Sequence, residues 1–306
     1  MVTERRKPSA VVIVNPQAGR LSKSARKRVL TALGGHFRVE KQATTGRDTG
    51  IDLAAKAASE GVRLVIAFGG DGLVNEVVNG LVDSPASLGI VPGGTMNVFA
   101  RALGVPRDPL RASNHLAAAA SRPPRKVTLG KMDERYFTFS AGCGFDAEAA
   151  EHVESAVPNK RRFGEAYFYW SAWRVLAGAY RHRNPSMILK GKFGEVPAAM
   201  AIASNAGPYA YLARRPVVLA PRVTLEAGLD LFALRRMRAE ALPGYAWKAM
   251  TAGGLAHHKD AFYASDLEVF DVVSEYPFHR HVDGEPLPPV RTASFHVARD
   301  ALSVWA

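Results

Sequence analysis

The chain has 306 residues, of which 47% are hydrophobic, and this is enough for two domains with cores of their own. Its net charge of +12 favours an anionic partner, such as a nucleotide, a nucleic acid or an acidic membrane surface. The single cysteine, Cys143, excludes an intramolecular disulfide and a cysteine-based zinc cluster, and it is typical of a reducing cytosol. No apolar run is long enough for a signal peptide or a transmembrane helix, so we expect a cytoplasmic protein.

The first half of the chain alternates short apolar runs with segments of helical periodicity. Strands are predicted at 10–14, 37–41, 62–68 and 87–91, and helices at 22–33, 48–60, 73–81 and 98–103. Asp48 is placed to cap the second of these helices. This alternation predicts a parallel sheet that is covered on both faces, with ligands bound at the carboxyl ends of its strands.

The loop after the first strand, Asn15-Pro16-Gln17-Ala18-Gly19-Arg20, lies at that edge of the predicted sheet. Pro16 stops strand pairing and Gly19 permits a turn, so Asn15 and Arg20 follow the carboxyl end of the strand directly. An ordinary turn between a strand and a helix explains the same residues.

The loop Gly69-Gly70-Asp71-Gly72 joins the third strand to the third helix. Its glycines let the backbone approach a ligand, and the new helix directs its unpaired N–H groups to the same place, which suits a phosphate. The carboxylate of Asp71 would repel a phosphate unless it holds Mg²⁺, orients a water on that ion or accepts a proton. The alternative is a tight turn in which Asp71 caps the helix.

A second glycine loop, Pro92-Gly93-Gly94-Thr95-Met96-Asn97, follows the fourth strand. We expect the two glycine loops to converge at one edge of the sheet, because both follow strands of the same parallel sheet. Neither loop is a Walker A sequence, and the signature motifs of protein kinases are absent from the sequence.

The composition changes at Pro123-Pro124, where we place a domain boundary between residues 1–124 and 125–306. The second part is rich in short strands with turn signals between them, which predicts an antiparallel sandwich. Four of these strands are expected near its end, at 267–273, 279–283, 293–298 and 302–305.

A basic, aromatic and largely helical insertion is predicted near 147–183. Arg161, Arg162, Trp170 and Trp173 belong to it, and rings of this kind settle at the depth of lipid headgroups. The insertion is therefore expected to contact an anionic membrane surface. A helix that packs on the sandwich with its basic face in water is the alternative.

The segment 278–287 carries the polar residues of the last part of the chain. On a continuous strand, His279, His281, Asp283 and Glu285 would point to one side. A metal site is one interpretation of this pattern, and a hydrogen-bonded strand histidine is the commoner one. Asp283-Gly284 is also typical of a hairpin turn.

The glycine loops resemble those of the diacylglycerol kinase and sphingosine kinase family of lipid kinases. The likeness rests on GGDG with x-x-x-E-V-x-N-G-L after it, and it extends to N-P-x-[SA]-G at Asn15, the threonine loop at Thr45, G-T-x-N at Gly94 and D-G-E at Asp283. This resemblance implies an α/β N-terminal domain of the NAD kinase and diacylglycerol kinase type, followed by a β-rich sandwich domain that binds the lipid.

The resemblance also implies roles for particular residues. ATP, taken with Mg²⁺, would be bound by Asn15, Gly19, Arg20, Thr45, Gly69, Gly70, Asp71, Gly72, Glu76, Gly93, Gly94, Thr95 and Asn97. Glu285 would be the catalytic base with Asp283 orienting it, and Asp71 would act through the Mg²⁺ of ATP.

The sequence departs from the family at three positions. Bacterial diacylglycerol kinases usually carry acidic residues where this chain has Val98, Thr128 and Ala227. The last of these acids helps to bind a structural Mg²⁺ in the family, so we expect that site to be lost or rebuilt here. Leu73 stands where many bacterial members have threonine, and it is more typical of the sphingosine kinase branch.

The sequence therefore predicts an ATP-dependent lipid kinase that acts at an anionic membrane surface. Diacylglycerol is the first candidate for the acceptor and a sphingoid base the second, and a relative that binds nucleotide or membrane without catalysis is the non-enzyme alternative. NAD kinases share the GGDG loop, but the D-G-E motif and the aromatic insertion speak against them. No nucleic-acid partner is expected, since no recognised module is present. The oligomeric state, a homodimer included, is left open.

Overall fold

The computed structural model describes residues 7–16, 22–145, 147–148, 187–212, 215–237, 241–250 and 254–306. The chain divides into two compact units: unit 1 is Met1–Val127 with Asp300–Ala306, and unit 2 is Thr128–Arg299. The sequence placed the boundary three residues earlier and did not foresee that the last residues return to unit 1. Their return follows from strand pairing, which local sequence patterns do not reveal.

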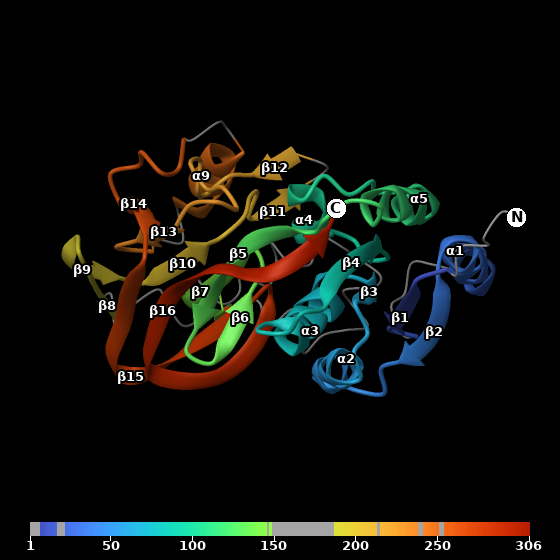
Figure 1. Ribbon diagram of the computed structural model, residues 1–306. Helices are drawn as coiled ribbons and strands as arrows, with labels where there is room; N and C mark the ends of the chain where they lie inside the picture. Colours follow the sequence, from blue (N-terminus) through green and yellow to red (C-terminus); the bar gives the residue numbers. More distant parts are fainter. Residues whose placement is uncertain are drawn as a thin grey trace, which may run out of the picture. The chain divides into compact units, whose positions relative to one another are not determined.

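Unit 1 is a parallel sheet with helices between its strands (Figure 1). Its elements are β1 (Ser9–Val14), α1 (Lys23–His36), β2 (Arg38–Ala43), α2 (Thr49–Ser59), β3 (Leu64–Gly69), α3 (Asp71–Leu81), β4 (Ser87–Pro92), α4 (Val98–Ala102) and α5 (Pro109–Ala119). The strand order is β2-β1-β3-β4, and the last residues of β16 (Glu285–Trp305) pair with β4 in parallel. The expected α/β architecture is confirmed.

The strands β1, β3 and β4 are buried on both faces of this sheet, as the continuous apolar runs of β3 and β4 predict, whereas the edge strand β2 is largely exposed. One core contains Val12 of β1, Leu33 of α1, Ile66 of β3 and Leu116 of α5. Helix α2 packs on α3, where a Cβ at Gly80 would lie 2.4 Å from the carbonyl oxygen of Ile51. These helices pack against the sheet and against each other, and the loops lie at the carboxyl edge of the sheet.

Unit 2 is rich in antiparallel strands. Its further elements are β5 (Arg125–Met132), β6 (Arg135–Phe137), β7 (Ser140–Gly144), β8 (Met187–Gly191), β9 (Gly194–Ala198), β10 (Met200–Ser204), β11 (Ala210–Leu212), β12 (Arg215–Val217), β13 (Leu229–Leu234), α9 (Leu242–Ala249), β14 (Ala261–Leu267) and β15 (Val269–Val282). The strand order is β14-β13-β10-β7-β15-β16, and neighbouring strands along it are antiparallel. The expectation of a β-rich second part is confirmed.

The end of the chain corrects the prediction of four short strands. β15 and β16 are instead two long strands joined by one hairpin, and their register shifts between Val273 and Phe278 and again before Arg280. Pro277 lies within the first shift, and bulges of this kind let a strand continue past a proline. In the part of the chain that the structure describes, no helix is long and apolar enough to cross a membrane.

Candidate functional site

The carboxyl ends of the four strands of unit 1 mark the candidate nucleotide site. The chain passes from β1 to β2 on one side and then to β3 on the other, so the connections diverge between β1 and β3. Open α/β sheets bind ligands at such a switch point. Asn15 follows β1 there, and Gly69 ends β3.

The two glycine loops are in direct contact at this edge. The N–H group of Gly93 donates to the carbonyl oxygen of Gly69 at 2.7 Å. A Cβ added at Gly94 would lie 2.6 Å from the Cα of Gly70, which is closer than side-chain carbons approach a backbone. The predicted convergence of the loops is confirmed, and it brings backbone without side chains to the surface where α3 begins.

Asp71 connects these two loops. It is half-buried at the first position of α3, and its Oδ1 atom accepts a hydrogen bond from the N–H group of Val98 at 2.7 Å. Asp71 therefore caps α4, the helix after the other loop, whereas the sequence alternative was a cap on its own helix. A negative charge at this place is favoured by the dipole of α4.

Asn97 shapes the second glycine loop from within. Its backbone is left-handed, with φ of 48°, and its side-chain amide binds both the N–H group and the carbonyl oxygen of Gly94. Thr95 lies at the tip of this loop and is exposed. We therefore assign the loop's shape to Asn97.

Glu76 has a structural role that the sequence did not indicate. Its side chain is only 7% exposed, and its carboxylate accepts hydrogen bonds from the N–H groups of Asp48 at 3.1 Å and Gly50 at 2.7 Å. Asp48 occupies the N-cap position of α2 as expected, but its side chain makes no cap hydrogen bond. Glu76 performs this capping from α3, and it thereby holds the start of α2.

The threonine loop after β2 is folded around one hydroxyl group. The N–H groups of Thr45 and Gly46 donate to Oγ1 of Thr49, which in turn donates to the carbonyl oxygen of Gly46 at 2.7 Å. Thr44 is tied to β1, because its N–H group donates to the carbonyl oxygen of Val14. The loop is fixed at the same edge of the sheet, with Thr45 exposed.

In unit 2, Asp283-Gly284 forms the turn of the β15–β16 hairpin. Both residues have positive φ angles, 48° and 81°, and Val282 pairs with Glu285 across the turn. A two-residue turn with both angles positive matches the twist of its strands, and Asp-Gly favours it. The hairpin alternative is therefore confirmed. Because the turn interrupts the strand, the four polar residues do not line one side of it, which corrects that expectation.

The carboxylate of Asp283 is buried and fully engaged. It accepts hydrogen bonds from the N–H groups of Thr138, Phe139 and Ser140 and from the hydroxyl of Thr138, at 2.8–3.1 Å. Burial raises the pKa of Asp283 above its ordinary value, and these hydrogen bonds oppose that shift. Asp283 therefore anchors the turn to β7, while Glu285 begins β16 as a half-buried residue.

His281 is 1% exposed, and its Nδ1 atom accepts a hydrogen bond from the N–H group of Gly284 at 3.2 Å. A neutral ring with this contact carries its proton on Nε2. Among the described residues, no group of three histidine, cysteine or acidic side chains could hold a metal ion. The contact with Gly284 favours the interpretation of His281 as a hydrogen-bonded strand histidine over that of a metal ligand.

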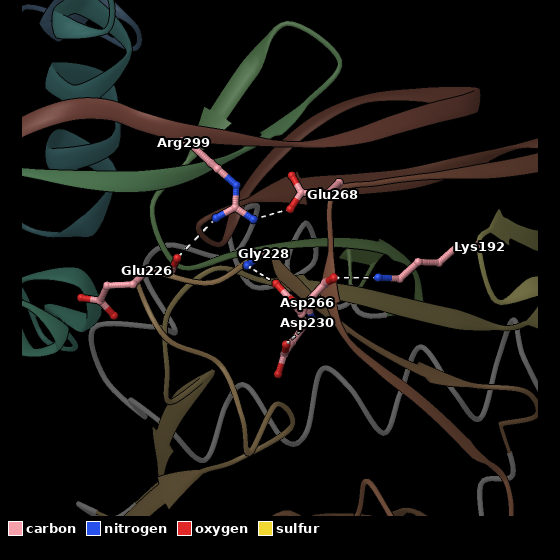
Figure 2. A network of polar contacts seen from close by, with 7 residues as sticks. All are labelled: Lys192, Glu226, Gly228, Asp230, Asp266, Glu268 and Arg299. Carbon is pink, nitrogen blue, oxygen red and sulfur yellow. Dashed lines mark hydrogen bonds and ion pairs between the residues drawn. The ribbon is translucent and has the colours of Figure 1, made fainter.

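The places where the family has acidic residues do not offer metal ligands here. Thr128 is buried and donates its N–H group to the carbonyl oxygen of Leu225, and Ala227 has no polar side-chain atom. The residues around the Ala227 turn form a different polar network, in which carboxylates and protein cations contact one another (Figure 2).

Gly19, Arg20, Arg161, Arg162, Trp170 and Trp173 lie outside the described residues. Asn205 was not singled out for a role, although it is 0% exposed and its amide nitrogen donates to the carbonyl oxygens of Thr128 and Thr138. In the sequence, the signal that could have indicated this role was an asparagine directly after the end of an apolar strand.

Comparisons with known proteins agree with the glycine loops. Residues 9–132 match the model of the diacylglycerol kinase catalytic domain. A segment of 172 residues is 36% identical to a diacylglycerol kinase of Bacillus subtilis (strain 168), covering 55% of each chain. A segment of 134 residues is 39% identical to the "Probable lipid kinase YegS-like" of Chromohalobacter salexigens, covering 42% of this chain and 41% of that protein.

The fold extends over nearly the whole chain. The crystal structure of a diacylglycerol kinase from Bacillus anthracis str. Sterne superposes with a TM-score of 0.69 at 20% identity, covering 97% of this chain and 96% of that one. The sequence matches span about half the length of the curated relatives. The resemblance to the diacylglycerol kinase family that the loops predicted is confirmed.

Proposed function

We propose that this chain, in which residues 9–132 match a diacylglycerol kinase catalytic domain, transfers the γ-phosphoryl group of ATP to the hydroxyl group of a lipid. The observation that carries the proposal is the close approach of Gly70 and Gly94, because it brings two glycine loops together beside the switch point of a parallel sheet. Phosphoryl transfer asks the protein chiefly for positioning and for neutralisation of charge.

The phosphates would bind to backbone N–H groups rather than to a lysine. The first N–H groups of α3 have no partner within that helix, and its dipole favours an anion at the same end. Gly69, Gly70, Gly72, Gly93 and Gly94 allow the close approach, and Asn15, Thr45 and Thr95 supply polar groups at the same edge. Gly19 and Arg20 are proposed from the sequence alone.

Asp71 is proposed to act on ATP, whereas Glu76 and Asn97 are proposed to act through the elements that they hold. Asp71 is proposed to act through the Mg²⁺ that ATP carries, since its carboxylate stands at the junction of the two loops. Glu76 and Asn97 are proposed as positioning residues, because their side chains hold α2 and the second loop respectively. The Mg²⁺ ion enters as part of the substrate, Mg²⁺·ATP.

Glu285 is proposed as the base for the lipid hydroxyl. Its carboxylate would take the proton as the hydroxyl oxygen attacks the γ-phosphorus, and the bond between that phosphorus and ADP would break. Asp283 would position Glu285 by fixing the turn. The carboxylate of Asp283 accepts hydrogen bonds from the N–H groups of Thr138, Phe139 and Ser140, which lead into β7.

Diacylglycerol is the proposed acceptor, and a sphingoid base is the second candidate. The sphingoid interpretation rests on Leu73 and Val98, and these side chains are only 6% and 1% exposed. They pack inside unit 1, so a direct contact with either lipid is not available to them. The basic insertion near 147–183 is proposed to dock on an anionic membrane.

The test is transfer of labelled γ-phosphate from Mg²⁺·ATP to diacylglycerol or a sphingoid base in anionic vesicles, with NAD as a competing acceptor. We expect transfer to diacylglycerol, its loss in Gly94→Ala, and its retention in Gly35→Ala. A Cβ at Gly35, in α1, meets no atom within 4 Å, so this variant is the matched control. Transfer to NAD alone would overturn the proposal. ATP binding without transfer to any lipid would support the non-catalytic alternative instead.

A further inference from the structure

The loop between Ala220 and Leu229 in unit 2 is held by two side chains of β14. The N–H group of Arg222 donates to the hydroxyl oxygen of Tyr263 at 3.2 Å, and the N–H group of Gly228 donates to Oδ1 of Asp266 at 2.8 Å. The loop is therefore pinned near both ends. Gly228 is required here, because a Cβ at this position would lie 2.9 Å from the carbonyl carbon of Asp266.

Asp230 joins these two contacts into one network. It is 1% exposed, and its carboxylate accepts a short hydrogen bond from the hydroxyl of Tyr263 and one at 3.2 Å from the N–H group of Asp266. Asp266 has a left-handed backbone with φ of 56°, beside a register shift between β13 and β14. This shift turns the backbone of Asp266 towards Asp230.

Two cationic side chains complete the network (Figure 2). Nζ of Lys192 donates to the carbonyl oxygen of Asp266 at 2.9 Å. Nη1 of Arg299 donates to the carbonyl oxygen of Glu226 at 3.4 Å, and its Nη2 forms an ion pair with Glu268. Figure 2 shows Arg299 between Glu226 and Glu268, and Lys192 reaching Asp266 from the other side.

These residues do not fit the structural Mg²⁺ that the family resemblance implies for this turn. Mg²⁺ requires several hard oxygen ligands in near-octahedral geometry. Ala227 supplies none, Oδ1 of Asp266 is bound to Gly228, and both oxygens of Asp230 accept hydrogen bonds. The carbonyl oxygens of Glu226 and Asp266 already face protein cations.

We propose that a metal-free polar clasp, made by Tyr263, Asp230, Asp266, Lys192 and Arg299, holds the 220–228 loop in place of a divalent cation. Hydrogen bonds from the backbone to fixed carboxylates supply the rigidity, and the guanidinium and ammonium groups supply the positive charge. The clasp is a property of unit 2 and does not depend on the proposed kinase activity.

The clasp is connected to the Asp-Gly turn by the register of the sheet. Asp230 pairs with Ser204 on β10, and Ser204 pairs with Ser140 on β7. The N–H group of Ser140 donates to the carboxylate of Asp283 at 3.1 Å. Loosening of the clasp is therefore expected to disturb the strand ends that hold the turn before Glu285.

The test is thermal unfolding of the full chain without nucleotide, in EDTA and in MgCl₂. We expect the same Tm in both solutions. Asp266→Ala should lower Tm by about 3–10 °C, because it leaves the N–H group of Gly228 without its acceptor. Asp266→Asn keeps an acceptor oxygen and tolerates the left-handed backbone, so it should lower Tm less and should still show no response to Mg²⁺.

Arg299→Ala provides a second test, with Arg291→Ala, an exposed arginine on the same strand, as its matched control. We expect Arg299→Ala to lower Tm by about 1–3 °C and Arg291→Ala to leave it unchanged. A rise of wild-type Tm with Mg²⁺ that Asp266→Asn abolishes would overturn the proposal. Equal Tm values for wild type, Asp266→Ala and Arg299→Ala would also overturn it.

Discussion

Oδ1 of Asp71 accepts a hydrogen bond at 2.7 Å from the N–H group of Val98, a residue 27 positions further along the chain. The aspartate of the first glycine loop thus holds the helix that follows the second loop. The contact lies beside the close approach of Gly70 and Gly94. A change at Asp71 can therefore act through the shape of the loops, through the charge at the site, or through both.

Two substitutions of Asp71 separate these effects. Asp71→Asn keeps an oxygen that can accept from Val98 but removes the negative charge, whereas Asp71→Ala removes both. If the charge acts through Mg²⁺·ATP, both variants should lose turnover by about 10²–10³, and both should raise the KM for Mg²⁺·ATP. Only Asp71→Ala should also lower the free energy of unfolding, by about 0.5–2 kcal/mol, as loss of a helix cap does.

The measurements are steady-state kinetics with varied Mg²⁺·ATP and denaturant unfolding of the two variants. Asp71→Asn with wild-type turnover would show that the residue serves only as a cap. In that case the proposed role in Mg²⁺·ATP handling would be wrong.

The vesicle-docking prediction concerns residues outside the described part of the chain and rests on composition. Arg161→Ala/Arg162→Ala should weaken co-sedimentation with anionic vesicles, and added salt should weaken that of the wild type, because salt screens surface charge. Lys27→Ala/Arg28→Ala removes the same charge from exposed positions on α1 and is the matched control. Equal binding by the two double variants would assign the attraction to net charge alone.

The strands and helices around the glycine loops could be predicted because their signals are local. The apolar run before Gly69 and the helical spacing after it lie within a few residues of each other. The convergence of the loops could also be predicted, since parallel strands bring their carboxyl ends to one edge.

The capping of α2 could not be predicted in the same way. Glu76 reaches Asp48 and Gly50 across 28 and 26 residues, and a carboxylate on a helix is locally typical of a solvated face. The clasp residues Tyr263 and Asp266 are also distant in sequence from the loop that they bind. Such contacts depend on packing between elements, which residue periodicity does not encode.

Glu285 and Asp283 are expected to differ in what their substitution changes. Glu285→Gln keeps the shape of the side chain but removes the base, so turnover should fall by about 10²–10⁴ while ATP affinity is unchanged. Asp283→Asn places an amide against the four donors of Thr138, Phe139 and Ser140, so it should lower the free energy of unfolding by about 1–3 kcal/mol.

Turnover of each variant with lipid and its unfolding in denaturant are the two measurements. Wild-type turnover of Glu285→Gln would place the base elsewhere and make Asp71 the next candidate. Wild-type stability of Asp283→Asn would contradict its role as the anchor of the turn.

The last prediction concerns the pH dependence of stability at Asp230. Burial raises the pKa of Asp230 above its ordinary value of 3.8, against the hydrogen bonds from Tyr263 and Asp266 and the charge of Arg222. The native state then holds this proton more strongly than the unfolded chain does. The resulting stabilisation is complete below a pH of about 4 and is lost as the pH rises through the raised pKa.

Asp230→Asn removes this titration, so the Tm of the wild type should rise relative to that of the variant as the pH falls from about 7 to 4. Differential scanning calorimetry of both proteins at fixed ionic strength measures the effect. Parallel curves for Asp230→Asn and the wild type would contradict the prediction. They would show that the hydrogen bonds from Tyr263 and Asp266 offset the effect of burial on the Asp230 carboxylate.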